Sequence, residues 1–347
     1  MNEMRGINVE PVTSWFEANI PGARGPLSFE LIAGGHSNLT YGVTDASGNR
    51  FVLRRPPLGH VLATAHDMSR EHRIIAALGP TDVPVAPALG LCTDETVNGS
   101  PFYVMAFVDG HVLRDLKIAE TTLDRASRRR AGDSVADVLA RIHAVDVKAV
   151  GLDDLGKHEG YIARQLKRWY SQFQSSNELT KRPVPLVHEV HDRLSARIPE
   201  QQGVAIVHGD YRLDNCMVGD DGAVIAVLDW EICTLGDPLA DVGLLQVYWT
   251  DPGDEEATLL GTPPTIADGF PTRAELTGRY AQASHRDLSQ LDFYVAFGYW
   301  KLACILEGVY SRYAGGAMGD ATGFEAFETQ VTRLAERAAE AADRVGG

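Results

Sequence analysis

The sequence predicts an α+β protein with two lobes, a small β-rich lobe over residues 1–107 and a larger, mainly helical lobe over residues 108–347. The length of 347 residues is enough for about two domains. Five runs typical of β-strands, separated by turn residues, fall within the first 107 residues, at 27–35, 38–45, 50–56, 85–92 and 102–107. Patterns typical of amphipathic helices dominate the rest, at 122–147, 161–174, 187–198, 287–313 and 323–344.

The composition excludes several classes of function. Apolar residues make up 44% of the chain and charged residues 23%, which is ordinary for a folded domain. The formal net charge of -15 argues against nucleic acid or an anionic membrane as a partner, because both require clustered Lys and Arg. The N-terminus carries no apolar signal segment, and no later apolar run is long enough to span a bilayer. We therefore expect a cytoplasmic protein.

The cysteines indicate neither a zinc site nor a disulfide framework. They are scattered along the chain, and none belongs to a C-x-x-C pair or has a histidine at ligand spacing: Cys92, Cys216, Cys233 and Cys304. We expect buried, reduced thiols, as is usual in the cytoplasm.

The first lobe carries two charged side chains, Arg54 and Glu71, on two successive predicted elements. Residues 9–20 predict a covering helix, and three strands follow it. Arg54 lies on the third of these strands, and Glu71 lies on the next helix, which ends at Gly79-Pro80. Alternation along the strand directs Arg54 and Arg55 to opposite faces, so we expect Arg55 to face the surface.

The stretch from Val204 to Leu245 carries the side chains best suited to chemistry. An apolar run at 204–207 predicts a buried strand that ends at His208-Gly209-Asp210. Asn215 follows, and after it come a strand, a Gly-Asp-Asp-Gly turn and an apolar strand that stops at Asp229. Phosphoryl transfer needs a carboxylate near the attacking hydroxyl and oxygen ligands for Mg²⁺. Asp210 can supply the first, and Asn215 and Asp229 can supply the second.

A structural interpretation of the two aspartates is also open. Asp is common in turns because its side chain hydrogen-bonds nearby backbone, and either Asp210 or Asp229 alone would fit that role. The combined spacing, H-x-D-x-x-x-x-N followed by an apolar run that ends in Asp, favours the catalytic interpretation.

The motifs HGDYRLDN and VLDWE resemble those of the aminoglycoside phosphotransferase branch of the protein-kinase-like fold. This branch includes choline-kinase-like enzymes and kinase-like domains related to acyl-CoA dehydrogenase fusion proteins. The resemblance covers about residues 28–310 and implies a Mg²⁺-dependent, ATP-dependent transferase. It further implies that Asp210 is the catalytic base, that Arg212 lies near the γ-phosphate, that Asn215 and Asp229 bind Mg²⁺, and that His208 braces the loop.

The same resemblance implies a nucleotide site. Arg54 stands where kinases generally have Lys, and it can neutralise phosphate bidentately; Glu71 stands where its carboxylate partner would lie. The segment GGHSNLTYGV, with Ser37, stands where a phosphate-covering hairpin would lie, although it lacks the G-x-G-x-x-G of protein kinases. The remaining residues expected to bind the nucleotide are Met105, Phe107, Val108 and Met217.

The segment after Asp229 indicates a small-molecule acceptor. It has no D-F-G glycine and no A-P-E motif, and only Trp230 to Ala240 separate Asp229 from Asp241. A long activation segment that holds a peptide has no room, so we expect no protein substrate. Asp241 opens an apolar helix and is expected to cap it, and Asp237 is either a turn residue or supports the metal site.

The identity of the acceptor stays open. The net charge and the acidic loop at 251–256 suit a cationic aminoglycoside, whereas Arg164, Lys167 and Arg168 beside Trp169 suit an anionic acceptor such as a hydroxyacyl-CoA. These basic residues could also be a solvated helix face whose aromatic neighbours lie in the core. A different class, a nucleotide-binding pseudoenzyme or regulatory module, also remains open because of Arg54 and the missing glycine. The polar segments at 175–185 and 250–272 are expected to be loops, the second a lid.

Overall fold

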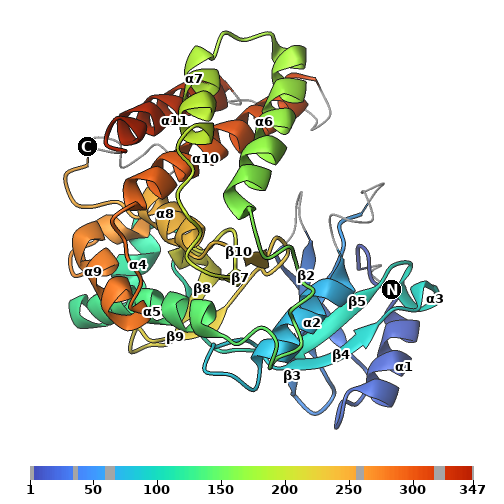
Figure 1. Ribbon diagram of the computed structural model, residues 1–347. Coiled ribbons are helices and arrows are strands. Elements are labelled where there is room, and N and C mark those ends of the chain that lie inside the picture. The colour runs from blue at the N-terminus through green and yellow to red at the C-terminus, as the bar shows by residue number, and fades with distance from the viewer. Residues whose placement is uncertain (1–3, 34–37, 59–66, 255–261, 316–324, 346–347) are drawn as a thin grey trace. The chain divides into compact units, whose positions relative to one another are not determined.

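A computed structural model describes the chain except residues 1–3, 34–37, 59–66, 255–261, 316–324 and 346–347 (Figure 1). The described chain divides into two compact units. Unit 1 contains Met1–Gly110 and Ile225–Glu231, and unit 2 contains His111–Val224 and Ile232–Gly347. The division near residue 107 was expected from the first run of strands. The return of Ile225–Glu231 to unit 1 was not expected.

Unit 1 is built on a five-stranded antiparallel sheet with the order β1-β2-β3-β5-β4. Its elements are α1 (Val9–Asn19), β1 (Ser28–Ala33), β2 (Leu39–Thr44), β3 (Arg50–Arg55), α2 (Met68–Leu78), β4 (Ala88–Cys92), α3 (Glu95–Asn98) and β5 (Phe102–Ala106). All of the strands expected in the first lobe are present, with ends that differ by a few residues. The sheet is therefore predictable from its alternating apolar residues.

The two faces of this sheet have different roles. Phe51 and Leu53 of β3 belong to an apolar core that also contains Val12 and Phe16 of α1. Strand alternation turns Arg54 to the opposite face, where α2 packs against β4 and β5. This alternation directs the Arg54 guanidinium toward α2 and away from the apolar core.

The expectation that Arg55 faces solvent was wrong. The side chain does lie on the face opposite Arg54, but Arg55 is only 7% exposed. Its guanidinium donates hydrogen bonds to the carbonyl oxygens of Gly6 and Asn98, so the N-terminal segment and the end of α3 cover it. Alternation predicts the face of a strand, but it does not predict what covers that face.

Unit 2 is mainly helical, with α10 at its centre. Its helices are α4 (Leu116–Thr122), α5 (Arg125–Ala144), α6 (Tyr161–Thr180), α7 (Pro185–Ser195), α8 (Leu239–Tyr248), α9 (Arg273–Ser284), α10 (Leu291–Ala314) and α11 (Glu325–Asp343). Helix α10 packs against α6, α7, α8 and α11, and α5 packs against α9 (Figure 1). The predicted α+β class is thus confirmed.

Short strands in unit 2 surround the expected catalytic stretch. They are β6 (His111–Val112), β7 (Ala205–Val207), β8 (Cys216–Val218) and β10 (Thr234–Gly236), while β9 (Val224–Val227) leads the chain back to unit 1. Strand β7 pairs with β10, and β6 pairs with β8, both in antiparallel fashion. The turn between β8 and β9 closes through hydrogen bonds from Gly219 N to Ala223 O and from Gly222 N to Gly219 O, as the sequence predicted.

Several elements were missed or misplaced by the sequence analysis. Helix α6 continues through Thr180, into a segment that was expected to be a loop. Helix α9 was missed although Thr272 and Glu275 form a complete capping box at its start, a signal that the sequence carries. The two-residue strand β6 and the short strand β10 are set by pairing between distant segments, which local patterns do not reveal.

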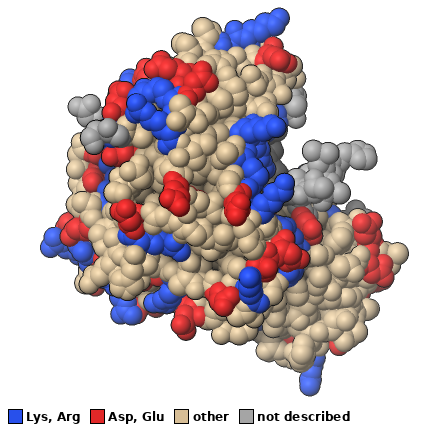
Figure 2. Space-filling view, viewed as in Figure 1, with Lys and Arg blue, Asp and Glu red and all other residues tan. Residues whose placement is uncertain are grey.

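No helix in the described part of the chain combines the length and the apolar character needed to cross a membrane. On the face drawn in Figure 2, acidic and basic side chains are interspersed.

Replacing Gly243 by Ala should destabilise the protein, because α8 and α10 pack closely at this position. An ideal Cβ on Gly243 would lie 2.4 Å from the backbone carbonyl of Tyr294 in α10, and backbone atoms cannot move aside as a flexible side chain can. We expect a loss of about 1–3 kcal/mol in the free energy of unfolding, measured by urea denaturation.

Gly278→Ala is the matched control for this substitution. Gly278 also lies inside a helix, α9, but nothing lies within 4 Å of its ideal Cβ position. Ala should therefore stabilise the protein there by roughly 0.5–1 kcal/mol. Equal effects of the two substitutions would contradict the close contact between α8 and α10.

Candidate functional site

The loop after β7 presents the side chains that the sequence singled out. Strand β7 is completely buried and pairs with β10, so its end is fixed in the interior of unit 2. His208, Gly209 and Asp210 follow immediately. Gly209 has a φ of 85°, a left-handed conformation that favours glycine. The chain turns here and brings Asp210 to a position where its side chain is 27% exposed.

A buried carboxylate holds the backbone of this loop. Asp241 of α8 accepts hydrogen bonds from the backbone N–H groups of His208 at 2.7 Å and Gly209 at 2.8 Å. The expectation that Asp241 caps its own helix was wrong, because the N-cap of α8 is Pro238. Placed inside the first turn of α8, the carboxylate reaches across to the loop.

Asp241 also contacts a buried histidine. His143 Nε2 lies 3.4 Å from Asp241, and His143 Nδ1 lies 2.7 Å from the hydroxyl of Tyr280. Burial lowers the pKa of His143, with Asp241 acting in the opposite direction. Burial opposes ionisation of Asp241, but hydrogen bonds from His143 and from the loop backbone outweigh it and lower the pKa of Asp241. His143 is thus a buried packing histidine, and it also supports the carboxylate that holds the loop.

Lys301 binds the loop at the carbonyl of Gly209. Its Nζ donates a 2.8 Å hydrogen bond to that oxygen and lies 5.6 Å from the centre of the Trp169 ring. Lys301 is buried within α10, and burial lowers its pKa, while the charges of Asp210 and Asp241 act in the opposite direction. The loop backbone is therefore bound by a carboxylate at its N–H groups and by an ammonium group at a carbonyl.

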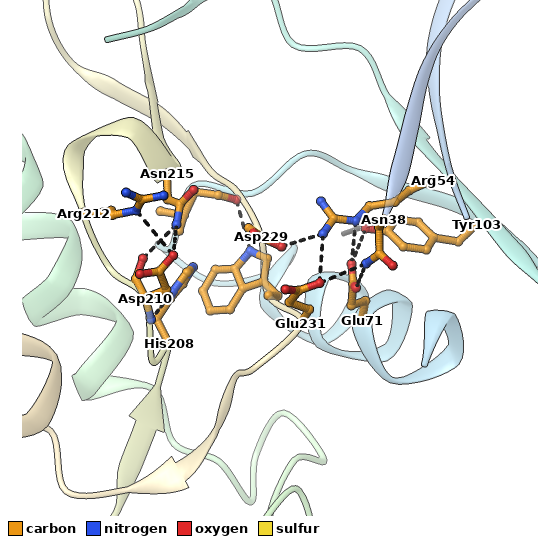
Figure 3. A network of polar contacts seen from close by, with 12 residues as sticks. Asn38, Arg54, Glu71, Tyr103, His208, Asp210, Arg212, Asn215, Asp229 and Glu231 are labelled. Atoms are coloured by element: carbon orange, nitrogen blue, oxygen red, sulfur yellow. Dashed lines mark hydrogen bonds and ion pairs between the residues drawn. The ribbon is translucent and has the colours of Figure 1, made fainter. Parts of the chain in front are cut away.

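The Asp210 side chain lies among the other predicted residues of this loop (Figure 3). Asn215 Nδ2 donates to the Asp210 carbonyl at 2.8 Å and to its carboxylate at 3.0 Å. Arg212 Nε lies 3.3 Å from the Asp210 carboxylate and 3.1 Å from that of Asp214. His208 is completely buried, and its Nδ1 accepts a 3.3 Å hydrogen bond from the Asp210 backbone N–H, which agrees with a bracing role.

Unit 1 contains a second charged network, centred on Arg54 (Figure 3). Arg54 lies 3.0 Å from Glu71, 2.5 Å from Asp229 and 3.8 Å from Glu231. The structure thus brings together Arg54 and Glu71, the two residues that the sequence placed on a strand and on the helix after it. Asp229 joins them because Ile225–Glu231 belongs to unit 1.

Neutral side chains orient the carboxylates of this network. Asn38 Nδ2 donates to Glu71 at 2.8 Å and to Glu231 at 3.2 Å, and the Tyr103 hydroxyl donates to Glu71 at 3.0 Å. Burial raises the pKa of Glu71, and Arg54 acts in the opposite direction. Burial alone would lower the pKa of Arg54, but the surrounding carboxylates raise it, so the guanidinium stays charged.

Asp229 has an unusual backbone conformation. Its φ of 62° lies in the left-handed region, which non-glycine residues adopt uncommonly. Such conformations cluster at functional positions because the surrounding structure must maintain them. The side chain is 31% exposed, so it remains accessible while it contacts Arg54.

The donor set suits Mg²⁺ better than a metal that needs a complete protein cage. Among the described residues, no three His, Cys, Asp or Glu side chains form a preformed metal cluster. Mg²⁺ usually takes one or two carboxylates together with phosphate oxygens and water, and it therefore needs few protein ligands. Asn215 and Asp229 are oxygen donors of this kind, and Asn215 retains its Oδ1 because its Nδ2 is bound to Asp210.

The other residues expected to bind a nucleotide are distributed over both units. Met105 lies on β5, Phe107 and Val108 follow that strand, and Met217 lies on β8. The Phe107 ring lies 3.5 Å beneath the Arg50 guanidinium. Ser37 lies outside the described residues.

Sequence reasoning missed several members of the two networks. Asn38, Tyr103 and Glu231 join the Arg54 network, although Glu231 stands only two residues after Asp229. Lys301 was not singled out within the helix predicted at 287–313. Its charge within the apolar run of α10 was a usable signal, because buried Lys is rare unless it is paired.

This chain is similar in sequence to a known family and to known proteins. Residues 28–294 match the model of the Phosphotransferase enzyme family. Mouse acyl-CoA dehydrogenase family member 10 is 35% identical over 308 residues, which are 86% of this chain and 28% of that protein. Mouse acyl-CoA dehydrogenase family member 11 is 32% identical over 333 residues, which are 94% of this chain and 42% of that protein. The chain therefore spans less than half the length of these relatives.

Solved structures agree with this assignment. A protein from Ralstonia eutropha, provisionally named an aminoglycoside phosphotransferase, has 35% identity and a TM-score of 0.82, covering 97% of this chain and 99% of its own. Choline kinase from Cryptosporidium parvum has a TM-score of 0.66 at 13% identity, covering 96% of each chain, and shows the fold alone. The predicted kinase-like fold is thus confirmed, and the chain belongs to the phosphotransferase enzyme family.

Proposed function

We propose that this protein is a kinase that transfers the γ-phosphate of ATP, with Mg²⁺, to a hydroxyl group of a small molecule. The observation that carries the proposal is the loop after β7, in which Asn215 and Arg212 both contact the partly exposed carboxylate of Asp210. Family membership supports the reaction class. The roles given below to individual residues rest on their chemistry and on the resemblance of their motifs.

Asp210 is the proposed base. An accessible carboxylate can orient an acceptor hydroxyl and accept its proton, which phosphoryl transfer requires near the attacking oxygen. Arg212 is proposed to neutralise charge at the γ-phosphate. Asp210 and Arg212 extend from a loop whose backbone is hydrogen-bonded by Asp241 and Lys301. Because this loop is already ordered, little conformational entropy is lost when substrates bind.

The Arg54 network is proposed to bind the phosphates of the nucleotide. Arg54 would neutralise phosphate charge, and Glu71, with hydrogen bonds from Asn38 and Tyr103, would hold Arg54 in place. The remaining residues proposed for the nucleotide site are Ser37, Met105, Phe107, Val108 and Met217.

The charge of this network supports a requirement for a divalent cation. One guanidinium faces three carboxylates, Glu71, Asp229 and Glu231, so the formal sum of +1 and -3 is -2. Such a cluster would repel a bare triphosphate, and bound Mg²⁺ would supply the missing positive charge. Asp229 can contact Arg54 through Oδ1 and retain Oδ2 as a metal ligand, and Asn215 is the second proposed ligand.

The acceptor class is the open part of the proposal. The names of the mammalian relatives point to acyl-CoA metabolism, and a hydroxyacyl-CoA is therefore a candidate beside aminoglycosides, amino alcohols and sugars. Helix α6 supports the solvated interpretation of its basic face in part, because Trp169 and Phe173 are buried and Lys167 and Arg168 are exposed. Arg168 nevertheless lies 4.9 Å from the centre of the Trp169 ring. We propose no protein, nucleic-acid or membrane substrate.

Removing the proposed metal ligand should weaken nucleotide binding only when Mg²⁺ is present. ATP is titrated into the wild type and Asp229→Asn by calorimetry, with Mg²⁺ and with a chelator. The wild type should bind ATP more tightly with Mg²⁺, and the variant should lose about tenfold or more of that affinity. Asp220→Asn removes the same charge at an exposed turn and is the control. Equal affinities under all conditions would remove Asp229 from the metal site.

Removing the proposed base should stop transfer and spare nucleotide binding. Asp210→Ala should lower kcat by about 10²–10⁴-fold with the acceptor that gives the highest turnover, while the Kd for ATP stays within about twofold. Coupled ADP detection gives kcat, and calorimetry gives the Kd. Wild-type turnover in the variant would refute the assignment of Asp210. ATP binding with no turnover of any hydroxyl compound by the wild type would favour the pseudoenzyme.

A further inference from the structure

Unit 2 contains a cavity of about 340 Å³ beside the proposed catalytic loop. Its lining comes from that loop, from the end of α8, from the start of α9, and from α10 and α11. This volume lies at the lower end of the range for small-molecule sites, roughly 300–1,000 Å³. The cavity can thus hold a compact molecule or one end of a larger one.

The charge of the cavity is opposite to that of the chain. Five arginines line it: Arg114, Arg212, Arg273, Arg337 and Arg344. Its acidic lining residues are Asp214, Asp254 and Glu340, so the formal sum of +5 and -3 is +2. The whole chain carries -15. The positive formal charge of the cavity lining therefore differs in sign from the net charge of the chain. Such a lining favours the binding of anions.

The arginines on α11 and after it, Arg337 and Arg344, each form an ion pair with a nearby carboxylate. Arg212 contacts Asp210 and Asp214, and Arg273 contacts Asp254 at 2.5 Å and the backbone of Trp249, so both are held in place. Arg337 pairs with Glu340 on the same helix at 2.9 Å, and Arg344 pairs with Asp292 at 3.0 Å. The Arg344–Asp292 pair is exposed to solvent and the Arg337–Glu340 pair is partly exposed, and ion pairs in such positions are weak, so a bound anion can compete with the carboxylates.

The cavity reaches the proposed base through an aromatic side chain. Tyr248 lines the cavity and is close enough to Asp210 for the carboxylate to act on its pKa. Burial raises the pKa of Tyr248 and the negative charge of Asp210 acts in the same direction, so the hydroxyl keeps its proton. The Arg212 guanidinium lies 4.9 Å from the centre of the same ring. A molecule in the cavity would therefore lie beside the residues assigned to transfer.

We propose that this cavity is the acceptor site, and that Arg337 and Arg344 bind a carboxylate or phosphate group of the acceptor. The assignment of the cavity as an acceptor site rests on the proposed kinase function. The binding of an anion in the cavity does not depend on catalysis. It opposes a polycationic acceptor in this cavity. It also locates acceptor recognition on residues near the C-terminal end of the described chain, away from the basic face of α6.

The test measures anion binding directly. Citrate and inorganic phosphate, as carboxylate and phosphate probes, are titrated by calorimetry at about 150 mM salt, where screening acts over roughly 8 Å. The protein is first saturated with Mg²⁺ and a non-hydrolysable ATP analogue, which occupies the proposed nucleotide site. The proteins compared are the wild type, Arg337→Gln/Arg344→Gln, and Arg333→Gln.

Arg333 provides the matched control. It lies one turn earlier on α11 and pairs with Glu336 in the same i,i+3 arrangement that joins Arg337 to Glu340, but it does not line the cavity. The double variant should bind at least one probe about tenfold or more weakly, and Arg333→Gln should bind like the wild type. The probe that is affected identifies the anionic group.

Two further variants keep the outcome decisive. Arg337→Lys/Arg344→Lys retains both charges and should recover part of the affinity, which separates charge recognition from loss of folding. Asp220→Asn, which removes a charge at an exposed turn outside the cavity lining, should bind the probes like the wild type. Equal binding by the wild type and the double glutamine variant, or no binding of either probe, would overturn the anion site. Failure to bind the ATP analogue, with anion binding intact, would instead count against the proposed function.

Discussion

Two buried charged side chains, Asp241 and Lys301, hydrogen-bond the backbone of His208 and Gly209, and the candidate site in unit 2 depends on these hydrogen bonds. Asp241 binds the N–H groups and Lys301 binds a carbonyl. Loss of either side chain would leave buried backbone N–H or C=O groups of the loop without their hydrogen-bond partner, which destabilises the protein. These hydrogen bonds also explain why α8 and α10 must pack closely, since α8 carries Asp241 and α10 carries Lys301. Asp210 then extends from a fixed backbone.

The same principle operates in unit 1 with the opposite balance. Arg54 is surrounded by carboxylates, two of which are positioned by Asn38, and the network keeps an excess of negative charge. In unit 2 the acceptor cavity has an excess of positive charge. A divalent cation suits the first and an anionic acceptor suits the second. The two proposals therefore follow from one consideration, the charge that each group of side chains leaves unbalanced.

The sequence predicted what is local and missed what is distant. The positions of Asp210, Asn215 and Asp229 could be predicted because each follows from a strand end or a turn, and the pairing of Arg54 with Glu71 was implied by the resemblance to kinases. Lys301 and Gly209 are 92 residues apart in the sequence, and Asn38 and Glu231 are 193 residues apart. No local sequence pattern predicts these two hydrogen bonds. Arg55 and Asp241 were misjudged for the same reason, since their partners lie on segments whose position only the fold determines.

Detection of the phosphorylated product tests most directly whether the protein transfers phosphate from ATP to a small molecule. The protein is incubated with Mg²⁺ and ATP and with separate pools of anionic, neutral and cationic hydroxyl compounds. Mass spectrometry then follows phosphate esters and ADP in each pool. We expect a phosphate ester to appear together with an equal amount of ADP, and to appear in the anionic pool before the other pools. Binding of ATP with no ester in any pool, or ADP matched only by free phosphate, would contradict it.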